Sequence, residues 1–126
     1  MILADTSIWI DFFRTETKVF VEFRSLLEKG EVVSLDCIFG ELLQGASHQR
    51  ERKLILEYWD SIPKITITDL WLKAGSFSSE SKMISKGVGL IDCAIILAAR
   101  FVGASIWTKD KKMNGVLAIT ERYQRG

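Results

Sequence analysis

The stretch that decides the fold lies at residues 1–10, MILADTSIWI, where an apolar run ends at Asp5. Residues 1–4 have the length and composition of a buried strand, and residues 7–13 carry apolar side chains at helical spacing. A carboxylate at this junction either caps the helix or serves a site at the strand end. The stretch therefore predicts the first strand–helix unit of an α/β domain.

The same alternation of strand and helix continues along the chain. Residues 17–29 have helical periodicity and are closed by Gly30, a common stop signal. Further strands are expected at residues 31–35, 65–68, 104–108 and 116–119, and further helices at 36–45, 47–61, 69–86 and 90–101. This order predicts an α/β fold with a mostly parallel central sheet. Neither a repeat nor a linker divides residues 1–126, so we expect a single domain.

Composition excludes several classes of protein. The chain has 126 residues, 48% of them hydrophobic and 26% charged, which suits an ordinary globular domain. No apolar run reaches the roughly 18 residues of a membrane span, and no basic segment precedes the first apolar run, so we expect a cytoplasmic protein. Cys37 and Cys93 are far apart and His48 is the only histidine. A disulfide framework, a zinc motif and a Ser-His-Asp triad are therefore all disfavoured.

Four carboxylates stand in apolar or small-residue sequence near predicted strand ends and helix starts: Asp5, Glu41, Asp92 and Asp110. An ionised carboxylate beside buried surface is costly unless it is paired or bound to a cation. In open parallel sheets ligands bind beyond the carboxyl ends of the strands, where Asp5 and Asp110 are expected. The pattern therefore predicts a site for a hard divalent metal with oxygen ligands.

Each carboxylate also has a plainer interpretation. Asp5 could only cap a helix, and Glu41 could lie on the exposed side of its helix. Asp92 would lie in a first helical turn, where the helix dipole favours a negative charge. Asp110, followed by two lysines, could be a turn residue. The metal-site prediction therefore depends on all four occurring together.

Two further patterns suggest partners. Residues 100–126 carry six basic and two acidic side chains, a net +4. A basic flank beside an acidic pocket suits a polyanionic substrate, although a solvated surface would look the same. Residues 7–29 carry more large apolar side chains than one helical face needs, so a partner helix could bind there.

Four blocks of sequence together resemble the PIN-domain ribonucleases. They are residues 5–11 (DTSIWID), 40–45 (GELLQG), 92–99 (DCAIILAA) and 108–110 (TKD). Their order and spacing cover essentially the whole chain. In length and motif order the chain is similar to the VapC toxins of VapBC toxin–antitoxin systems.

The resemblance implies a three-layer α/β/α fold and an endoribonuclease that depends on Mg²⁺ or Mn²⁺. Carried onto this chain, the family's acidic quartet is Asp5, Glu41, Asp92 and Asp110, of which Asp5 and Asp92 are tied most directly to the metal. It also implies small hydroxyl residues beside the metal and basic residues that hold substrate phosphates: Thr6, Thr108, Lys109, Lys111 and Lys112. Met113 stands where many relatives have an aromatic residue.

The implied chemistry is attack by a metal-activated water on a phosphodiester bond, which leaves a 5′-phosphate and a 3′-hydroxyl. The implied partners are a VapB-type antitoxin, an RNA substrate and a second copy of the chain. Transfer RNA is the common target among relatives.

Other interpretations stay open from the sequence. The chain could be a PIN-domain nuclease of RNA processing without an antitoxin, or a non-catalytic α/β binding module. A response receiver would need an acid pair after the first strand, but Asp5 is followed by Thr6 and Ser7. A haloacid-dehalogenase-like phosphatase would need a second aspartate at the position of Ser7.

Overall fold

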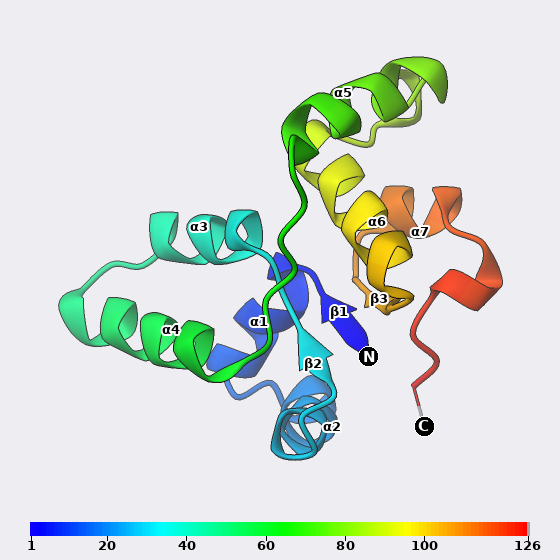
Figure 1. Ribbon diagram of the computed structural model, residues 1–126. Coiled ribbons are helices and arrows are strands. Elements are labelled where there is room, and N and C mark those ends of the chain that lie inside the picture. The colour runs from blue at the N-terminus through cyan, green and yellow to red at the C-terminus, as the bar shows by residue number, and fades with distance from the viewer. Residues whose placement is uncertain (126) are drawn as a thin grey trace.

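The computed structural model describes residues 1–125 and shows helices surrounding a small sheet (Figure 1). In chain order the elements are β1 (Ile2–Ala4), α1 (Thr6–Phe13), α2 (Thr17–Glu28), β2 (Val32–Val33), α3 (Asp36–Gln44), α4 (Gln49–Ser61), α5 (Leu70–Glu80), η1 (Ile84–Lys86), α6 (Leu90–Val102), β3 (Ser105–Trp107), α7 (Lys111–Val116) and η2 (Ile119–Glu121).

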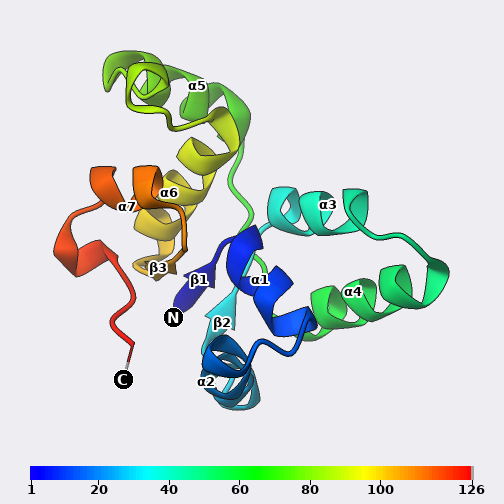
Figure 2. The ribbon, with the colours of Figure 1, turned by 180° about the vertical axis from the view of Figure 1, so that it is seen from behind.

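The sheet has three parallel strands in the order β2–β1–β3. Leu3 pairs with Val33 on one side and with Ile106 on the other. Helices α1–α4 gather on one side of the strands and α5–α7 on the other, in both views (Figures 1 and 2). Because helices cover both faces, the strands are almost wholly apolar. The predicted three-layer α/β/α fold is confirmed.

Strand order places a ligand position at the centre of the sheet. The chain passes from β1 to β2 on one side and later returns to β3 on the other side of β1. Such a reversal opens a crevice at the carboxyl ends of the two strands. Here those ends are occupied by Asp5 and Thr108, and the Asp5 N–H donates to the Trp107 carbonyl at 3.0 Å.

The core on the α1 side is aromatic. Trp9 is fully buried and its ring contacts the rings of five other side chains: Phe12, Phe13, Phe23, Phe39 and Tyr58. On the other side, α6 buries a run of mostly small and aliphatic residues from Cys93 to Ala99. Trp9 and Trp107 are both buried in the core. No helix in residues 1–125 is long and apolar enough to cross a membrane.

Two expected strands are wrong. Residues 65–68 form no strand, and only Lys64, next to Pro63, makes a single bridge to Ser34 at the edge of β2. Residues 116–119 also form none, since Val116 ends α7 and Ile119 begins η2. The chain joins the sheet later, through one bridge from Arg122 to Ile106.

Two expected helix starts differ as well. Leu35, rather than Asp36, is the N-cap of α3, and Asp36 lies in its first turn. His48, rather than Ser47, caps α4 by accepting from the Glu51 N–H. The helix expected from residue 69 to 86 ends at Glu80, and η1 follows.

The C-terminal segment packs against α2 through Tyr123 and Arg125. The Tyr123 hydroxyl donates to Glu22 Oε2 at 2.5 Å, and Arg125 Nε lies 3.0 Å from Glu22 Oε1. Tyr123 also packs on the Trp107 ring at the end of β3. These contacts link the end of the chain to both α2 and the sheet.

Replacing Tyr123 with Phe should lower the free energy of unfolding by about 1 kcal/mol, because a half-buried hydrogen bond to a carboxylate is lost. Burial and the nearby Glu22 raise the pKa of Tyr123 from 10.0 to about 12. The neutral phenol is therefore favoured in the folded protein. Its contribution is complete below about pH 10 and is lost as the pH rises towards 12. Urea unfolding of wild type and variant at pH 8 and above tests this, since a difference that grows with pH would contradict it.

Candidate active site

Asp5 is the N-cap of α1 and also lies at the crevice between β1 and β3. It caps α1, because its Oδ1 accepts from the Ser7 and Ile8 N–H groups at 3.0 and 3.4 Å. Its oxygens also accept from the Ser7 hydroxyl at 2.5 Å and from the Thr108 hydroxyl. Burial raises the pKa of Asp5, and these hydrogen bonds oppose that rise. The carboxylate is thus held in one orientation at the crevice.

Glu41 reaches the same region from α3. It is half-buried, and its Oε1 accepts from the Thr6 hydroxyl at 2.7 Å. Thr6 lies in the first turn of α1, directly after Asp5. The plainer interpretation, a glutamate on the exposed side of its helix, does not describe this contact between two helices.

The pKa of Asp92 responds to the charges of the other three predicted carboxylates. Its pKa is raised, first by burial and then by the negative charge of Asp110, with smaller contributions from Asp5 and Glu41. A hydrogen bond from the Gly89 backbone opposes the rise. Asp5, Glu41 and Asp110 therefore all lie within electrostatic range of Asp92, although they come from separate parts of the chain. These four predicted carboxylates are called the acidic centre below.

Asp110 stands at the start of α7 and, like Asp5, serves as an N-cap. Its Oδ1 accepts from the Lys112 and Met113 N–H groups at 2.8 and 3.3 Å. Its own N–H donates to Thr108 Oγ1 at 3.0 Å. Thr108 therefore connects the two capping aspartates, since its hydroxyl also donates to Asp5.

The β3–α7 loop is held to α1 by an ion pair that the sequence did not indicate. Lys109 Nζ lies 2.6 Å from Asp11 Oδ2, and the Asp11 carboxylate is nearly buried. The Lys109 N–H also donates to Ser7 Oγ at 3.2 Å. Asp11 and Ser7 belong to the DTSIWID block, but their contacts across about 100 residues depend on the folded chain.

The acidic centre is not a closed metal cage. Within residues 1–125, no three acidic, cysteine or histidine side chains come close enough together to hold a metal ion as they stand. Mg²⁺ commonly binds through one or two carboxylates and keeps several waters, so an open arrangement does not conflict with the donor set. The negative charges of Asp110, Asp5 and Glu41 raise the pKa of Asp92, so a cation bound here would relieve repulsion.

The predicted basic residues fall into two groups. Lys109 is engaged with Asp11, as described above. Lys111 and Lys112 are exposed in the first turn of α7, immediately after Asp110. Their position beside the acidic centre is compatible with the predicted contacts to substrate phosphates.

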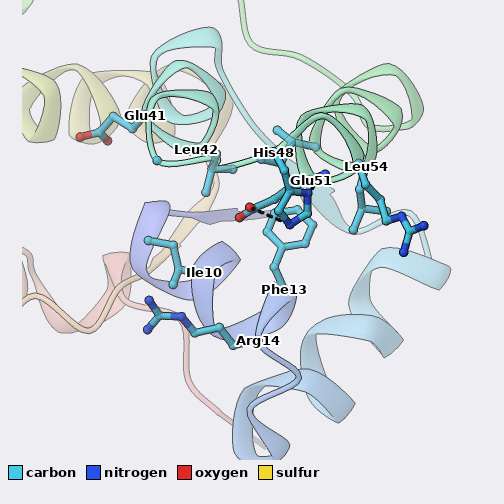
Figure 3. A pocket seen from close by; sticks show the side chains of 11 residues that line it. Ile10, Phe13, Arg14, Glu41, Leu42, His48, Glu51 and Leu54 are labelled. Atoms are coloured by element: carbon cyan, nitrogen blue, oxygen red, sulfur yellow. Dashed lines mark hydrogen bonds and ion pairs between the residues drawn. The ribbon is translucent and has the colours of Figure 1, made fainter.

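A groove borders the acidic centre between α1, α3 and α4 (Figure 3). Its volume is about 540 Å³, and most of its lining is apolar: Ile10, Phe13, Leu42, Leu54 and Ile55. Glu41 lies at its edge, while His48 and Glu51 lie together beside Phe13 (Figure 3). The groove therefore connects an apolar surface with one member of the acidic centre.

The expected apolar surface of residues 7–29 is smaller than the sequence indicated. Phe12 and Phe23 are buried in the aromatic core, and Phe13 and Phe20 are half-buried. Ile10 and Phe13 are the apolar side chains of this segment that line the groove, beside Arg14.

Comparison with known proteins agrees with this geometry. Residues 2–116 match the PIN domain family. The chain therefore belongs to the PIN-domain family.

Within this family, the chain is similar to several VapC ribonucleases. Ribonuclease VapC32 of Mycobacterium tuberculosis is 29% identical over 120 residues, which cover 94% of this chain and 91% of that protein. Ribonuclease VapC11 of the same organism and VapC ribonuclease Mb1587 of Mycobacterium bovis are each 28% identical over 126 residues, covering 95% of this chain and 94% of each relative. The resemblance to VapC ribonucleases inferred from the sequence blocks is confirmed.

Proposed function

We propose that this chain is a metal-dependent endoribonuclease and the toxin half of a toxin–antitoxin pair. The observation that supports it most directly is the electrostatic coupling of Asp92 to Asp110, Asp5 and Glu41 at the crevice between β1 and β3. Relatives that match over more than nine-tenths of their length are called ribonucleases.

The residues present suit Mg²⁺ or Mn²⁺, which prefer oxygen ligands. Asp5, Asp92, Glu41 and Asp110 would hold the ion, Asp5 and Asp92 most directly. When bound, the cation would supply Lewis acidity towards the scissile phosphate and lower the pKa of an attacking water. The protein would cut without a histidine, consistent with His48 as the only one in the chain.

The chain's own residues would orient this chemistry. The Ser7 and Thr108 hydroxyls fix both oxygens of Asp5, and the Thr6 hydroxyl fixes one oxygen of Glu41. The Asp11–Lys109 ion pair holds the loop that carries Thr108 and Asp110 against α1. Such positioning matters because errors of about 1 Å in a reacting geometry can cost a factor of about 100 in rate.

Removing divalent cations should abolish RNA cleavage, with a loss of at least about a thousandfold, because the ion supplies several kcal/mol of charge stabilisation. Cleavage should return when Mg²⁺ or Mn²⁺ is added back. EDTA that has been saturated with Mg²⁺ serves as the control for effects of the chelator itself. An unchanged cleavage rate in excess EDTA would refute the metal mechanism.

An antitoxin is the proposed protein partner, and the groove beside Glu41 is its proposed position. An apolar face of a partner segment could cover Ile10, Phe13 and Leu42, in the helix-in-groove manner. Such a partner would lie against the acidic centre and block access to it. A small reading frame directly upstream of the gene would favour this proposal over an RNA-processing nuclease without an antitoxin.

A homodimer is also proposed, and a second apolar surface supports it. The outer faces of α5 and α6 expose Leu72 and Phe101 around a hollow of about 760 Å³. Large apolar side chains that are exposed around one hollow could be covered by a second copy of the chain.

The RNA that is cut can be identified together with the activity. We propose transfer RNA as the first candidate. Controlled expression in cells, followed by sequencing of new 5′-phosphate ends, would name the target and the cleavage position. Absence of new ends relative to an Asp92→Asn control would refute the ribonuclease proposal.

A further inference from the structure

A basic cavity lies beside the acidic centre, between the end of α5, η1, α6 and α7. Its volume is about 640 Å³, within the range of ligand sites. Among the described residues, its charged lining consists of Lys86, Arg100 and Lys112. The other four cavities described for this chain each include at least one carboxylate. This cavity therefore differs from the others in that all of its charged lining residues are positive.

Lys112 contacts both the basic cavity and the acidic centre. Its backbone N–H donates to Asp110 Oδ1 at 2.8 Å, while its side chain lines the cavity. The exposed first turn of α7 thus presents a carboxylate on one side and an ammonium group on the other. A strand of nucleic acid whose scissile phosphate lies at Asp110 would bring an adjacent phosphate to Lys112.

The loop before α6 is shaped to receive the Lys112 side chain. A Cβ on Gly87 would lie 2.6 Å from Lys112 Cδ and 3.2 Å from Nζ, so the lysine stem occupies space that any other residue would fill. Gly87 also has a φ of +76°, which favours glycine. Two residues later Gly89 is the N-cap of α6, whose first turn holds Asp92. Lys86, next to Gly87, provides the second exposed ammonium group.

Arg100 contributes less free charge than the two lysines. It makes two hydrogen bonds with Glu121, at 2.7 and 3.3 Å, and lies over the Phe77 ring. It therefore forms part of the wall of the cavity, while Lys86 and Lys112 are the groups available to an anion.

We propose that this basic cavity binds the phosphodiester backbone of the RNA substrate next to the scissile bond, through Lys86 and Lys112. The inference rests on the proposed function and adds to it the path of the strand, from the acidic centre over the first turn of α7 towards η1. Lys86 carries no sequence signal, because it lies outside the four blocks and outside the basic C-terminal segment.

The test measures RNA binding separately from cleavage. A fluorescein-labelled single-stranded 12-nucleotide RNA of mixed sequence is titrated with the Asp92→Asn protein, with or without Lys86→Gln and Lys112→Gln, from 0.05 to 1 M salt. Each phosphate contact to a single strand contributes about 0.7 to the slope of log affinity against log salt. The double lysine variant should therefore lower the slope by about 1.4, weaken binding about 20-fold at 0.1 M salt and match its parent near 1 M salt.

The matched control changes the same charge elsewhere. Lys29→Gln and Lys53→Gln remove two exposed ammonium groups, at the C-cap of α2 and on α4, away from the cavity. This control should retain nearly all of the slope and affinity. Equal weakening by both pairs would reduce the effect to net charge and overturn the inference. An unchanged slope with Lys86 and Lys112 replaced would also overturn it, while cleavage of RNA by the wild-type protein would leave the proposed function standing.

Discussion

RNA cleavage by the Asp92→Asn variant should be at least about a thousandfold slower than cleavage by the wild-type protein. The substitution keeps the size of the side chain and its place in the first turn of α6, but removes the charge that would hold a divalent cation. Calorimetric titration with Mn²⁺ should show weakened binding to the same variant. Asp60→Asn, an exposed change on α4, is the matched control and should cleave at the wild-type rate.

The same variant should be more stable than the wild-type protein when no metal is present. Burial and the charge of Asp110 raise the pKa of Asp92, so its ionised form destabilises the folded state. A raised folded pKa means that stability is lost as the pH rises through it, and that this loss is absent below the unfolded value near 4. The gain in Tm in EDTA should therefore be present at pH 7 and vanish towards pH 4. An Asp92→Asn protein with wild-type activity, or with lower stability at pH 7, would contradict the assigned role.

Trp9→Ala should produce the largest loss of stability of any single substitution considered for this chain, about 3–5 kcal/mol. Trp9 is fully buried and touches five aromatic rings from α1, α2, α3 and α4. Since domains of this size are stabilised by only about 5–15 kcal/mol, much of the margin would be lost. A drop in Tm of about 10–20 °C is expected by calorimetry.

Two other variants separate the causes of that loss. Trp9→Phe should be much milder, because the buried indole N–H has no hydrogen-bond partner within residues 1–125 and an aromatic ring is kept. Trp71→Ala removes a half-exposed ring on α5 and should change stability far less than Trp9→Ala. Equal losses at Trp9 and Trp71 would show that the aromatic core does not have the energetic role assigned to it.

The sequence predicted those features that follow from local pattern. Short apolar runs gave β1 and β3, and helical periodicity gave α1, α2 and α6 within one or two residues of their observed bounds. The predicted strand ends also led to the expectation that Asp5 and Asp110 lie at the same edge of the sheet. The strand expected at residues 116–119 does not form, because Ile119 is exposed rather than packed against an apolar layer.

Contacts between distant side chains were beyond sequence reasoning. Nothing local distinguishes Asp11 from an exposed helical aspartate, because its role depends on Lys109 from a loop 98 residues away. Likewise the space for the Lys112 stem exists only because Gly87 lies beneath it. For Asp5 the two interpretations weighed from the sequence, cap and site residue, do not exclude each other.

The capping role of Asp5 limits what can be concluded from an inactive variant at this position. Neutralising it would loosen the start of α1 and release the Ser7 and Thr108 hydroxyls at once. Loss of activity in such a variant could then result from a displaced backbone as easily as from loss of a metal-binding carboxylate. For trapping an intact RNA in crystals, Asp92 is accordingly the better position to disable, since the amide oxygen of an asparagine can still accept the hydrogen bond from the Gly89 backbone.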